Sequence, residues 1–347
     1  MKGRSFSRTH PGQGSTAVTV LLPIVVIFAF LVGCSGGPPD APAKAKKNVR
    51  VAVTPWPASA SLYIAQEKGY FRDEGLEATL KDYASGHLGL ADVVEGKADF
   101  AVAADTPIAR AAVRGKPVSV VGTVCEIERA ILIIARKDRG ISAPGDLRGK
   151  TIGVIAGSAS EFYLHIYLTT AYIHPKSVRI VDLAPGQVVP ALLSGEVDAV
   201  SAWAPHTTVL QDKLGRNAVV LHEPGLYTMS WNIVSSTDLT QHDPETIARF
   251  LRAILRADRL IAERPAEARA ITAKECGMDV AAVEREWSNC DFTTHLDQSL
   301  ILNLEDQSRW MTGKTAGNKR KTPNIMSHVY TKGLLAVHPG AVRIVGE

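Results

Sequence analysis

A repeated stretch of sequence limits what this chain can fold into more than any other feature does. Gly195–Pro205 is closely similar to Gly96–Pro107, and both contain a Gly-x-x-Asp motif followed by an apolar run. The tripeptide Ser-Ala-Ser also occurs twice, at Ser59–Ser61 and Ser158–Ser160, with the same spacing of about a hundred residues. Repetition at a fixed spacing indicates a duplicated structural unit. The sequence therefore predicts two equivalent halves.

Both copies contain the same order of predicted elements. A β-branched strand leads into a Ser-rich turn and a helix, and a second strand, a second helix and the Gly-x-x-Asp strand follow. Strands that alternate with helices indicate parallel or mixed sheets flanked by helices. Two extended segments, Ala130–Ala135 and Met229–Ser235, are predicted to cross between the halves as a hinge. We expect an α/β fold with lobe 1 at residues 49–132 and 233–347, and lobe 2 at residues 133–232.

The N-terminal segment has the pattern of a secretory leader. A basic start is followed by an apolar stretch from Ala17 to Val32 and then by Leu31-Val-Gly-Cys34, which resembles a bacterial lipobox. That resemblance implies a signal peptide at residues 1–33, lipid attachment to Cys34 and a flexible tether at residues 34–48. An uncleaved anchor helix is the alternative. In both cases we expect an extracytoplasmic, periplasmic or cell-surface protein that is held at a membrane.

Charge and composition exclude several function classes. The formal net charge is +4, and the dense basic run at Lys314 and Lys319–Lys321 is interpreted as a solvated loop, so no nucleic-acid partner is expected. No nucleophile constellation, metal-ligand set or cofactor loop is recognisable, so we expect no enzyme activity, no metal and no cofactor. Beyond Cys34 the chain has three cysteines, and whether Cys276 and Cys290 pair is left open.

Local patterns give three further predictions. The fold is expected to begin near Val49, and Cys125–Glu128 is expected to form a loop at a sheet edge or at the boundary between the lobes. Asp243 followed by proline predicts a capped helix, with Ile247, Phe250, Leu251, Ile254 and Leu255 as its buried stripe. The region that follows this helix is expected to pack against lobe 1.

Short motifs in unbroken order along the chain resemble one known family, the nitrate/sulfonate/taurine-type solute-binding proteins of ABC transporters. The similarity spans about Val49 to Ala273. The motifs that carry it are Ala65–Phe71, Gly75-Leu76, Ser85-Gly86, Gly96–Asp99, Asp146–Lys150, Gly157-Ser158 and Gly195–Ala199.

The resemblance implies a two-lobed, periplasmic-binding-protein-like fold of type II. Such a lipoprotein is expected to be a monomer that closes on a small sulfonate-, taurine- or nitrate-like solute in the cleft between its lobes and delivers it to permease subunits in the membrane. A thiamine-pyrimidine or aromatic solute is an alternative, and so is an enzyme like the pyrimidine synthase of thiamine biosynthesis. A sensory ligand-binding module is a third possibility.

The predicted solute contacts lie on loops after the strands, because ligands of α/β proteins bind beyond the carboxyl ends of the strands. Ser59, Ser61, Ser158 and Ser160 lie at two helix starts, where the helix dipole favours an anion. Ser158 and Glu161 have the Ser-x-x-Glu spacing that predicts a capping box at the second helix start. Ordinary capping without ligand contact is the alternative for all four serines.

Aromatic and acidic residues complete the predicted site. Trp56 and Trp203 occupy equivalent loops and are expected to line the cleft, although buried packing is the alternative. Asp105 and Glu126 would suit the amine of a taurine-like zwitterion, or would be structural. The remaining predicted contacts are Ser85, Ala159 and Tyr227.

Overall fold

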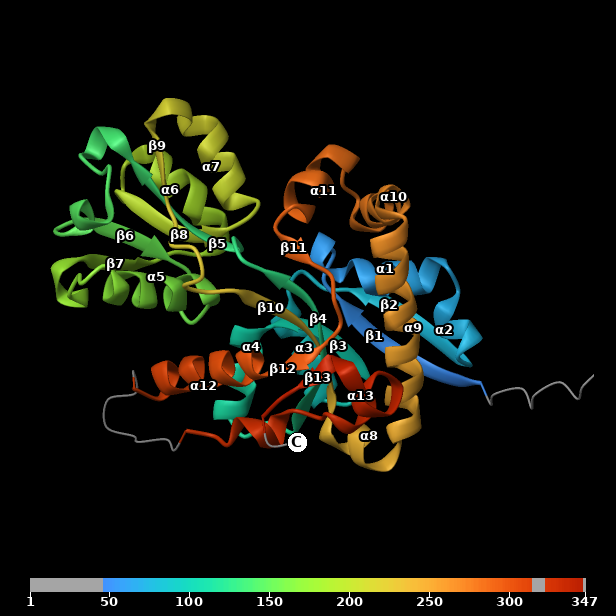
Figure 1. The fold of residues 1–347 in the computed structure, drawn as a ribbon. Coiled ribbons are helices and arrows are strands. Elements are labelled where there is room, and N and C mark those ends of the chain that lie inside the picture. Colours follow the sequence, from blue (N-terminus) through green and yellow to red (C-terminus); the bar gives the residue numbers. More distant parts are fainter. Residues whose placement is uncertain (1–45, 314–321, 346–347) are drawn as a thin grey trace, which may run out of the picture. The chain divides into compact units, whose positions relative to one another are not determined.

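A computed structural model describes residues 46–313 and 322–345. The predicted leader, Cys34 and almost all of the predicted tether lie outside the described residues, as does the basic run at Lys314–Lys321. The described residues form two β-sheets with helices packed against them (Figure 1).

The larger sheet has six strands in the order β11-β4-β10-β3-β1-β2. β1 is parallel to both β2 and β3, whereas β10 is antiparallel to its neighbours β3 and β4. The strands are β1 (Lys47–Val53), β2 (Leu76–Asp82), β3 (Phe100–Ala104), β4 (Val118–Ile127), β10 (Met229–Ser236) and β11 (Cys290–Asp291). The sheet is therefore mixed, as predicted from the alternation of strands and helices.

The smaller sheet has five strands in the order β7-β6-β8-β5-β9. β6 is parallel to β7 and β8, and β5 is antiparallel to β8 and β9. The strands are β5 (Ile131–Arg136), β6 (Thr151–Val154), β7 (Arg179–Asp182), β8 (Ala199–Trp203) and β9 (Ala218–Leu221). Helices α5 (Ala159–Thr170), α6 (Val188–Ser194) and α7 (His206–Leu214) pack against these strands.

The helices of the larger sheet include most of the C-terminal part of the chain. α12 packs on α4 and α9 packs on α1, so the prediction that this region lies against the first part of the fold is confirmed. These helices are α1 (Ala60–Glu67), α2 (Tyr70–Asp73), α3 (Gly86–Val94), α4 (Asp105–Val113), α8 (Thr237–His242), α9 (Pro244–Glu263), α10 (Pro265–Cys276), α11 (Val280–Trp287), α12 (Gln298–Gly313) and α13 (Lys332–Val337). Two short strands, β12 (Leu296–Asp297) and β13 (Val342–Arg343), pair with each other.

α9 supplies the centre of the apolar core. The predicted stripe is confirmed for Ile247, Phe250, Leu251 and Ile254, which have no exposed surface, whereas its fifth member, Leu255, is partly exposed. The ring of Phe250 stacks on Phe100 at 4.0 Å between centroids and on Phe71 at 4.9 Å. Full burial of one such side chain stabilises a fold by about 1.5–3 kcal/mol. The stack therefore joins the sheet, α2 and α9 into one packed unit.

β4 is longer than predicted. The expected loop at Cys125–Glu128 is wrong, because β4 continues to Ile127 and its last residue pairs with Met229 of β10. Pairing with β10 continues the strand past the polar residue Glu126. The local sequence around Glu126 does not predict this extension. β1 also begins at Lys47, two residues before the predicted start, because Lys47 and Asn48 pair with the first residues of β2.

The strands predicted to cross between the halves each belong to one sheet. β5 lies wholly in the smaller sheet and β10 wholly in the larger one. The chain therefore passes from one sheet to the other in residues 128–130, and it returns in residues 222–228.

Cys125, Cys276 and Cys290 are free thiols, so no bond joins Cys276 to Cys290. The thiol of Cys290 interacts with Cys125, which lies one strand away across the β4–β11 ladder. Burial first, and then the neighbouring Cys290, raises the pKa of Cys125 well above its ordinary value.

Candidate functional site

One edge of each sheet carries the loops predicted to bind a ligand, and we call it the carboxyl edge. In the larger sheet β1, β3 and β4 end at this edge and β10 begins there. In the smaller sheet β6 and β8 end at the corresponding edge and β5 begins there. The connection at residues 128–130 joins the two edges, and the four Cα steps from Ile127 to Ile131 span at most about 14 Å. The two carboxyl edges are therefore close together.

The start of α5 is built by a network of hydroxyl and carboxylate groups. Ser158 is the N-cap residue, and its Oγ accepts from the Ser160 amide at 3.2 Å and donates to the Ile155 carbonyl at 2.6 Å. The Glu161 carboxylate accepts from the Gly157 amide at 2.6 Å, one residue before the position that a capping box uses. Helix α5 thus begins where the sequence predicts, and Ser158 is partly exposed at this helix start.

Ser160 and Ala159 lie behind this helix start. Both are buried, and the Ser160 hydroxyl accepts from the Ile155 amide at 3.1 Å. Ser160 therefore orients the turn before α5, and Ser158 is the member of this group with exposed surface.

Arg110 of α4 lies against the same helix start, and sequence reasoning missed it. A β-carbon at Gly157 would come within 2.7 Å of the Arg110 guanidinium, and Gly157 also has a φ of +67° that favours glycine. The guanidinium makes no hydrogen bond or ion pair with any residue that the structure describes. Burial, followed by the nearby Arg114, lowers the pKa of Arg110, and Glu161 opposes that shift. The sequence signal is a single cation in the alanine-rich helix Ile108-Ala-Arg-Ala-Ala112.

Trp56 and Ser59 form a second group, on the loop after β1. The indole N–H of Trp231 donates to Ser59 Oγ at 3.1 Å, and Ser59 donates to the Thr54 carbonyl at 2.9 Å. Trp56 packs edge-on against Trp231 at 5.3 Å between ring centroids. Ser59 and Trp231 are buried, whereas Trp56 keeps part of its ring exposed. Trp56 is therefore the residue of this group that a solute can reach.

Asp105 is completely buried, and protein donors occupy its carboxylate. Oδ1 accepts from the Tyr227 hydroxyl and from the Thr106 amide, both at 2.7 Å. Oδ2 accepts from the Asn303 side chain at 2.6 Å and from the Ser230 amide at 3.4 Å. Burial raises the pKa of Asp105 despite these bonds. In this structure Asp105 joins α4, α12 and β10 rather than facing a solute amine.

Tyr227 links the two parts of the fold. Its ring is buried and lies edge-on to Phe162 of α5 at 5.7 Å, while its hydroxyl reaches Asp105. Phe162 in turn contacts Trp310 of α12 at 5.4 Å between centroids. Aromatic pairs at such distances each contribute about 0.5–1.5 kcal/mol beyond their burial. The cluster therefore holds the start of α5 beside α4 and α12.

The other predicted contacts lie apart from these groups. Ser61 is buried and donates to Asp258 of α9 at 2.7 Å, and Ser85 bonds His87 at 2.9 Å at the start of α3. Trp203, the last residue of β8, is partly exposed and lies edge-on to His206. Glu126 points from β4 towards His295.

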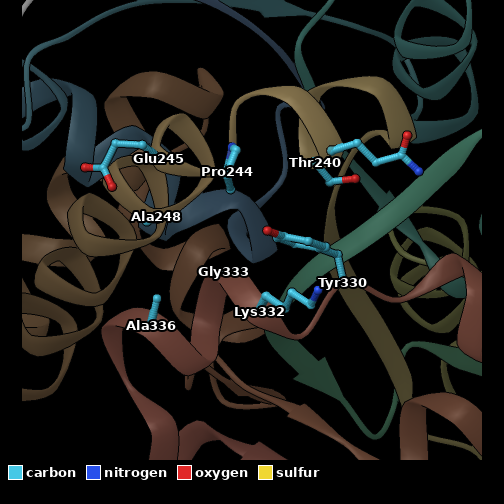
Figure 2. Close-up of a pocket in the computed structure, with 9 residues that line it drawn as sticks. Thr240, Pro244, Glu245, Ala248, Tyr330, Lys332, Gly333 and Ala336 are labelled. Atoms are coloured by element: carbon cyan, nitrogen blue, oxygen red, sulfur yellow. The ribbon is translucent and has the colours of Figure 1, made fainter.

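Two cavities lie away from these groups. A cavity of about 590 Å³ lies between α8, α9 and α13, at the opposite end of β10, and its lining includes Thr240, Glu245, Tyr330 and Lys332 (Figure 2). A second cavity of about 360 Å³ lies beside β2. No helix among the described residues is long and apolar enough to cross a membrane.

Comparisons with known proteins give one family and one fold. A model of the NMT1/THI5-like family matches residues 56–268, which is more than half of the chain. A putative aliphatic sulfonates-binding protein of Bacillus subtilis is 24% identical over 325 residues, which cover 92% of this chain and 97% of that protein.

Two solved structures show how far the fold extends. The periplasmic aliphatic sulphonate binding protein SsuA of Escherichia coli matches with a TM-score of 0.70 and 17% identity, over 82% of this chain and 98% of that one. The desulfurization enzyme DSZB matches with a TM-score of 0.63 and 18% identity, over 85% and 99%. The chain thus has the predicted two-sheet fold of the periplasmic binding proteins, a fold that binding proteins share with an enzyme.

Proposed function

This chain belongs to the NMT1/THI5-like family, and from that premise we propose that it is the extracytoplasmic solute-binding subunit of an ABC importer. It would capture a small organic anion, best a sulfonate, between the two carboxyl edges and deliver it to permease subunits in the membrane. The function of the relative from Bacillus subtilis, which is named for aliphatic sulfonates, supports this class of solute.

One observation carries the proposal. The Arg110 guanidinium is half-buried beside the start of α5 and has no hydrogen-bonding partner among the described residues. An arginine and a helix N-terminus both stabilise negative charge, and a sulfonate offers three acceptor oxygens to such donors. Together with the partly exposed Ser158 at this helix start, these groups form a site for an anionic head group.

The rest of the solute is proposed to be apolar. Trp56 follows β1 and Trp203 ends β8, both at the carboxyl edge, and each keeps part of its surface exposed. A bare alkyl or aryl chain packs well against such rings. Protein donors occupy the carboxylate of Asp105, so this carboxylate is not available for the pairing with the amine of taurine that the sequence predicts. An alkanesulfonate therefore fits better than a zwitterion.

Binding without chemistry is favoured over the enzyme alternative. Thiolates are the reactive form of cysteine, and burial raises the pKa of Cys125 and raises that of Cys276 to about 12. Neither thiol is thus an activated nucleophile. A desulfurization enzyme with this fold, as DSZB is, would release inorganic sulfur from a bound sulfinate or sulfonate, and we expect none from this protein.

The membrane attachment is part of the same proposal. Lipid on Cys34 would hold the protein at the membrane, with residues 34–48 as a tether, lobe 1 at residues 49–132 and 233–347, and lobe 2 at residues 133–232. We expect the Cys34→Ser variant to leave the membrane fraction when cells are fractionated. Unchanged membrane association would argue for an uncleaved anchor instead.

Isothermal titration with alkanesulfonates, taurine, nitrate, aromatic carboxylates and thiamine pyrimidines tests the proposed solute class. The test variant is Arg110→Gln, and Arg114→Gln is the matched control because Arg114 lies one turn along on the exposed end of α4. A hydrogen bond to a charged group contributes about 1.5–3 kcal/mol, so Arg110→Gln should weaken sulfonate binding by about 10- to 100-fold. Equal sulfonate affinities in the two variants would show that Arg110 does not contact the solute. Selective binding of a thiamine pyrimidine would show that the proposed solute class is wrong.

A further inference from the structure

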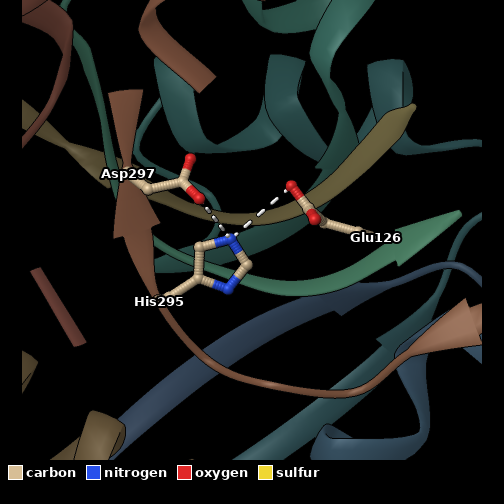
Figure 3. A group of neighbouring side chains, drawn as sticks. All are labelled: Glu126, His295 and Asp297. Atoms are coloured by element: carbon tan, nitrogen blue, oxygen red, sulfur yellow. Dashed lines mark ion pairs between the residues drawn. The ribbon is translucent and has the colours of Figure 1, made fainter. Parts of the chain in front are cut away.

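His295 has a buried imidazole nitrogen without a hydrogen bond. The residue is 4% exposed and lies between β11 and β12, and its Nε2 atom makes no hydrogen bond to any group that the structure describes. Figure 3 shows this nitrogen pointing at the carboxylates of Glu126 and Asp297. A buried polar atom without a hydrogen bond is costly, so its surroundings need an explanation.

The other ring nitrogen of His295 is held by the backbone. Nδ1 lies 2.7 Å from the carbonyl oxygen of Thr293, which can only accept, so Nδ1 carries a proton and donates. In neutral imidazole the lone pair is then on Nε2, directed at the two carboxylates. Histidines that bind metals are usually oriented in this way, by a hydrogen bond from their second nitrogen to a carbonyl or carboxylate.

The separations in the group suit a metal ion better than direct hydrogen bonds. Nε2 lies 3.6 Å from Oε1 of Glu126 and 3.4 Å from Oδ2 of Asp297. A charged N–H to carboxylate bond is normally about 2.7–2.9 Å long. Ligands about 2.0–2.2 Å from a tetrahedral zinc ion are, by geometry, roughly 3.3–3.6 Å apart. Both distances from Nε2 thus match those between ligands of a common centre, and all three ligand atoms lie within 4.8 Å of one another.

Strand pairing fixes the three side chains. Glu126 lies in β4, and the backbone of His295 exchanges two hydrogen bonds with Thr123 of the same strand, at 2.8 and 3.0 Å. Asp297 lies in β12, and its Oδ1 accepts from the Ser299 hydroxyl at 2.6 Å, which leaves Oδ2 turned towards His295. The site is therefore preorganised on rigid elements.

We propose that His295, Glu126 and Asp297 form a binding site for a divalent transition-metal ion of the zinc class, with a fourth position open to solvent. One imidazole and two carboxylates are ligands that zinc accepts, and the two negative charges balance a divalent ion. The side chains of Glu126 and Asp297 are 28% and 20% exposed, so an ion can enter. Arg343 lies 3.6 Å from Oδ2 of Asp297, but it is 61% exposed and can turn away.

The ion would join β4 to the start of α12. Asp297 directly precedes α12, and Asn303 of that helix donates to Asp105. Metal binding would therefore stabilise the folded chain and fix the helix that contacts the proposed solute site. The metal site does not depend on the proposed solute, because none of its ligands contacts Arg110 or Ser158.

Titration of the metal-free, tag-free full-length protein with zinc chloride tests the site. We expect one saturable zinc ion per chain and a higher melting temperature with zinc. Cobalt in place of zinc should give the strong visible absorption of a tetrahedral ion. Glu126→Gln, which keeps the size of the side chain, should weaken zinc binding at least about tenfold.

The matched control is Glu128→Gln, because Glu128 is an exposed glutamate two residues further along the same chain segment. It should bind zinc as the unchanged protein does. Absence of a saturable site would overturn the proposal, and so would equal zinc affinities in the two variants. A His295→Asn variant tests the nitrogen ligand directly and should also bind zinc more weakly. If the His295→Asn variant does not fold, the comparison of Glu126→Gln with Glu128→Gln tests the proposal.

Discussion

Asp258 of α9 offers a test of how the interior of the larger sheet is held together. Its carboxylate accepts from the Ser61 hydroxyl at 2.7 Å and from the Thr294 amide at 3.0 Å. It thus joins α9 to α1 and to the segment before β12. Burial raises the pKa of Asp258 to about 6, although both hydrogen bonds oppose that shift. The change to test is Asp258→Asn, which removes the titrating group.

The sign of the effect follows from proton binding. The ordinary pKa of an aspartate is 3.8, so between about pH 4 and pH 6 the folded chain binds more protons at Asp258 than the unfolded chain does. The free energy of unfolding therefore falls as the pH rises through this window. A difference of about two pKa units corresponds to about 3 kcal/mol at full effect, and about 2 kcal/mol of this is reached at pH 4.0, where the unfolded carboxyl group is only partly protonated.

The assay is urea unfolding at pH 4.0 and pH 7.5, followed by tryptophan fluorescence. Relative to Asp258→Asn, the unchanged protein should lose about 2 kcal/mol of unfolding free energy between the two pH values. Any hydrogen bond lost in the variant costs the same at both pH values and cancels in this comparison. Parallel pH profiles for the two proteins would refute the reasoning.

A second carboxylate gives a control of opposite sign. Asp243 caps α9 and pairs with Lys47, and although burial alone would raise the pKa of Asp243, the bonds from Lys47 and Thr246 hold it below 3.8. Its stabilising contribution is present above about pH 4 and is lost as the pH falls through the folded pKa. Asp243→Asn should therefore cost stability at pH 7.5 and less at lower pH.

Three further substitutions test separate parts of the structure. Gly157→Ala forces a side chain into a left-handed conformation and against the Arg110 guanidinium, so it should weaken sulfonate binding in a titration and lower the melting temperature. Asn303→Ala leaves an oxygen of the buried Asp105 without its shortest bond and should cost about 1–3 kcal/mol in urea unfolding. Phe250→Ala opens the aromatic stack and should cost about 3–5 kcal/mol, whereas a loss below 1 kcal/mol would mean that the core relaxes around it.

The architecture could be predicted from the sequence because its signals are local and repeated. The two Ser-Ala-Ser turns and the two Gly-x-x-Asp motifs mark equivalent strands and helices, and the stripe of α9 has an unambiguous helical period. The end of β4 could not be predicted, because pairing with β10 carries the strand through Glu126. Such a tertiary contact leaves no mark on the local pattern.

The candidate site was harder to predict than the fold. The positions of the candidate residues after strands predict which loops carry the site, but they do not predict which side chains are accessible. Ser61 and Asp105 form hydrogen bonds in the protein interior, whereas Ser158 keeps exposed surface. Arg110 was missed because its importance depends on Gly157, which is distant in sequence and adjacent in space. The group around His295 depends in the same way on two distant segments of the chain, β4 and the residues around His295.

The length of the connection at residues 128–130 restricts how the two sheets can move apart. Because only three residues connect the end of β4 to the start of β5, these two corners of the sheets stay within about 14 Å of each other. The second connection, at residues 222–228, is longer and also holds Tyr227 in the aromatic cluster. If solute enters between the two edges as proposed, the sheets must open by rotating about that corner. The far ends of the two edges would then separate, while residues 128–130 and their neighbours would move little.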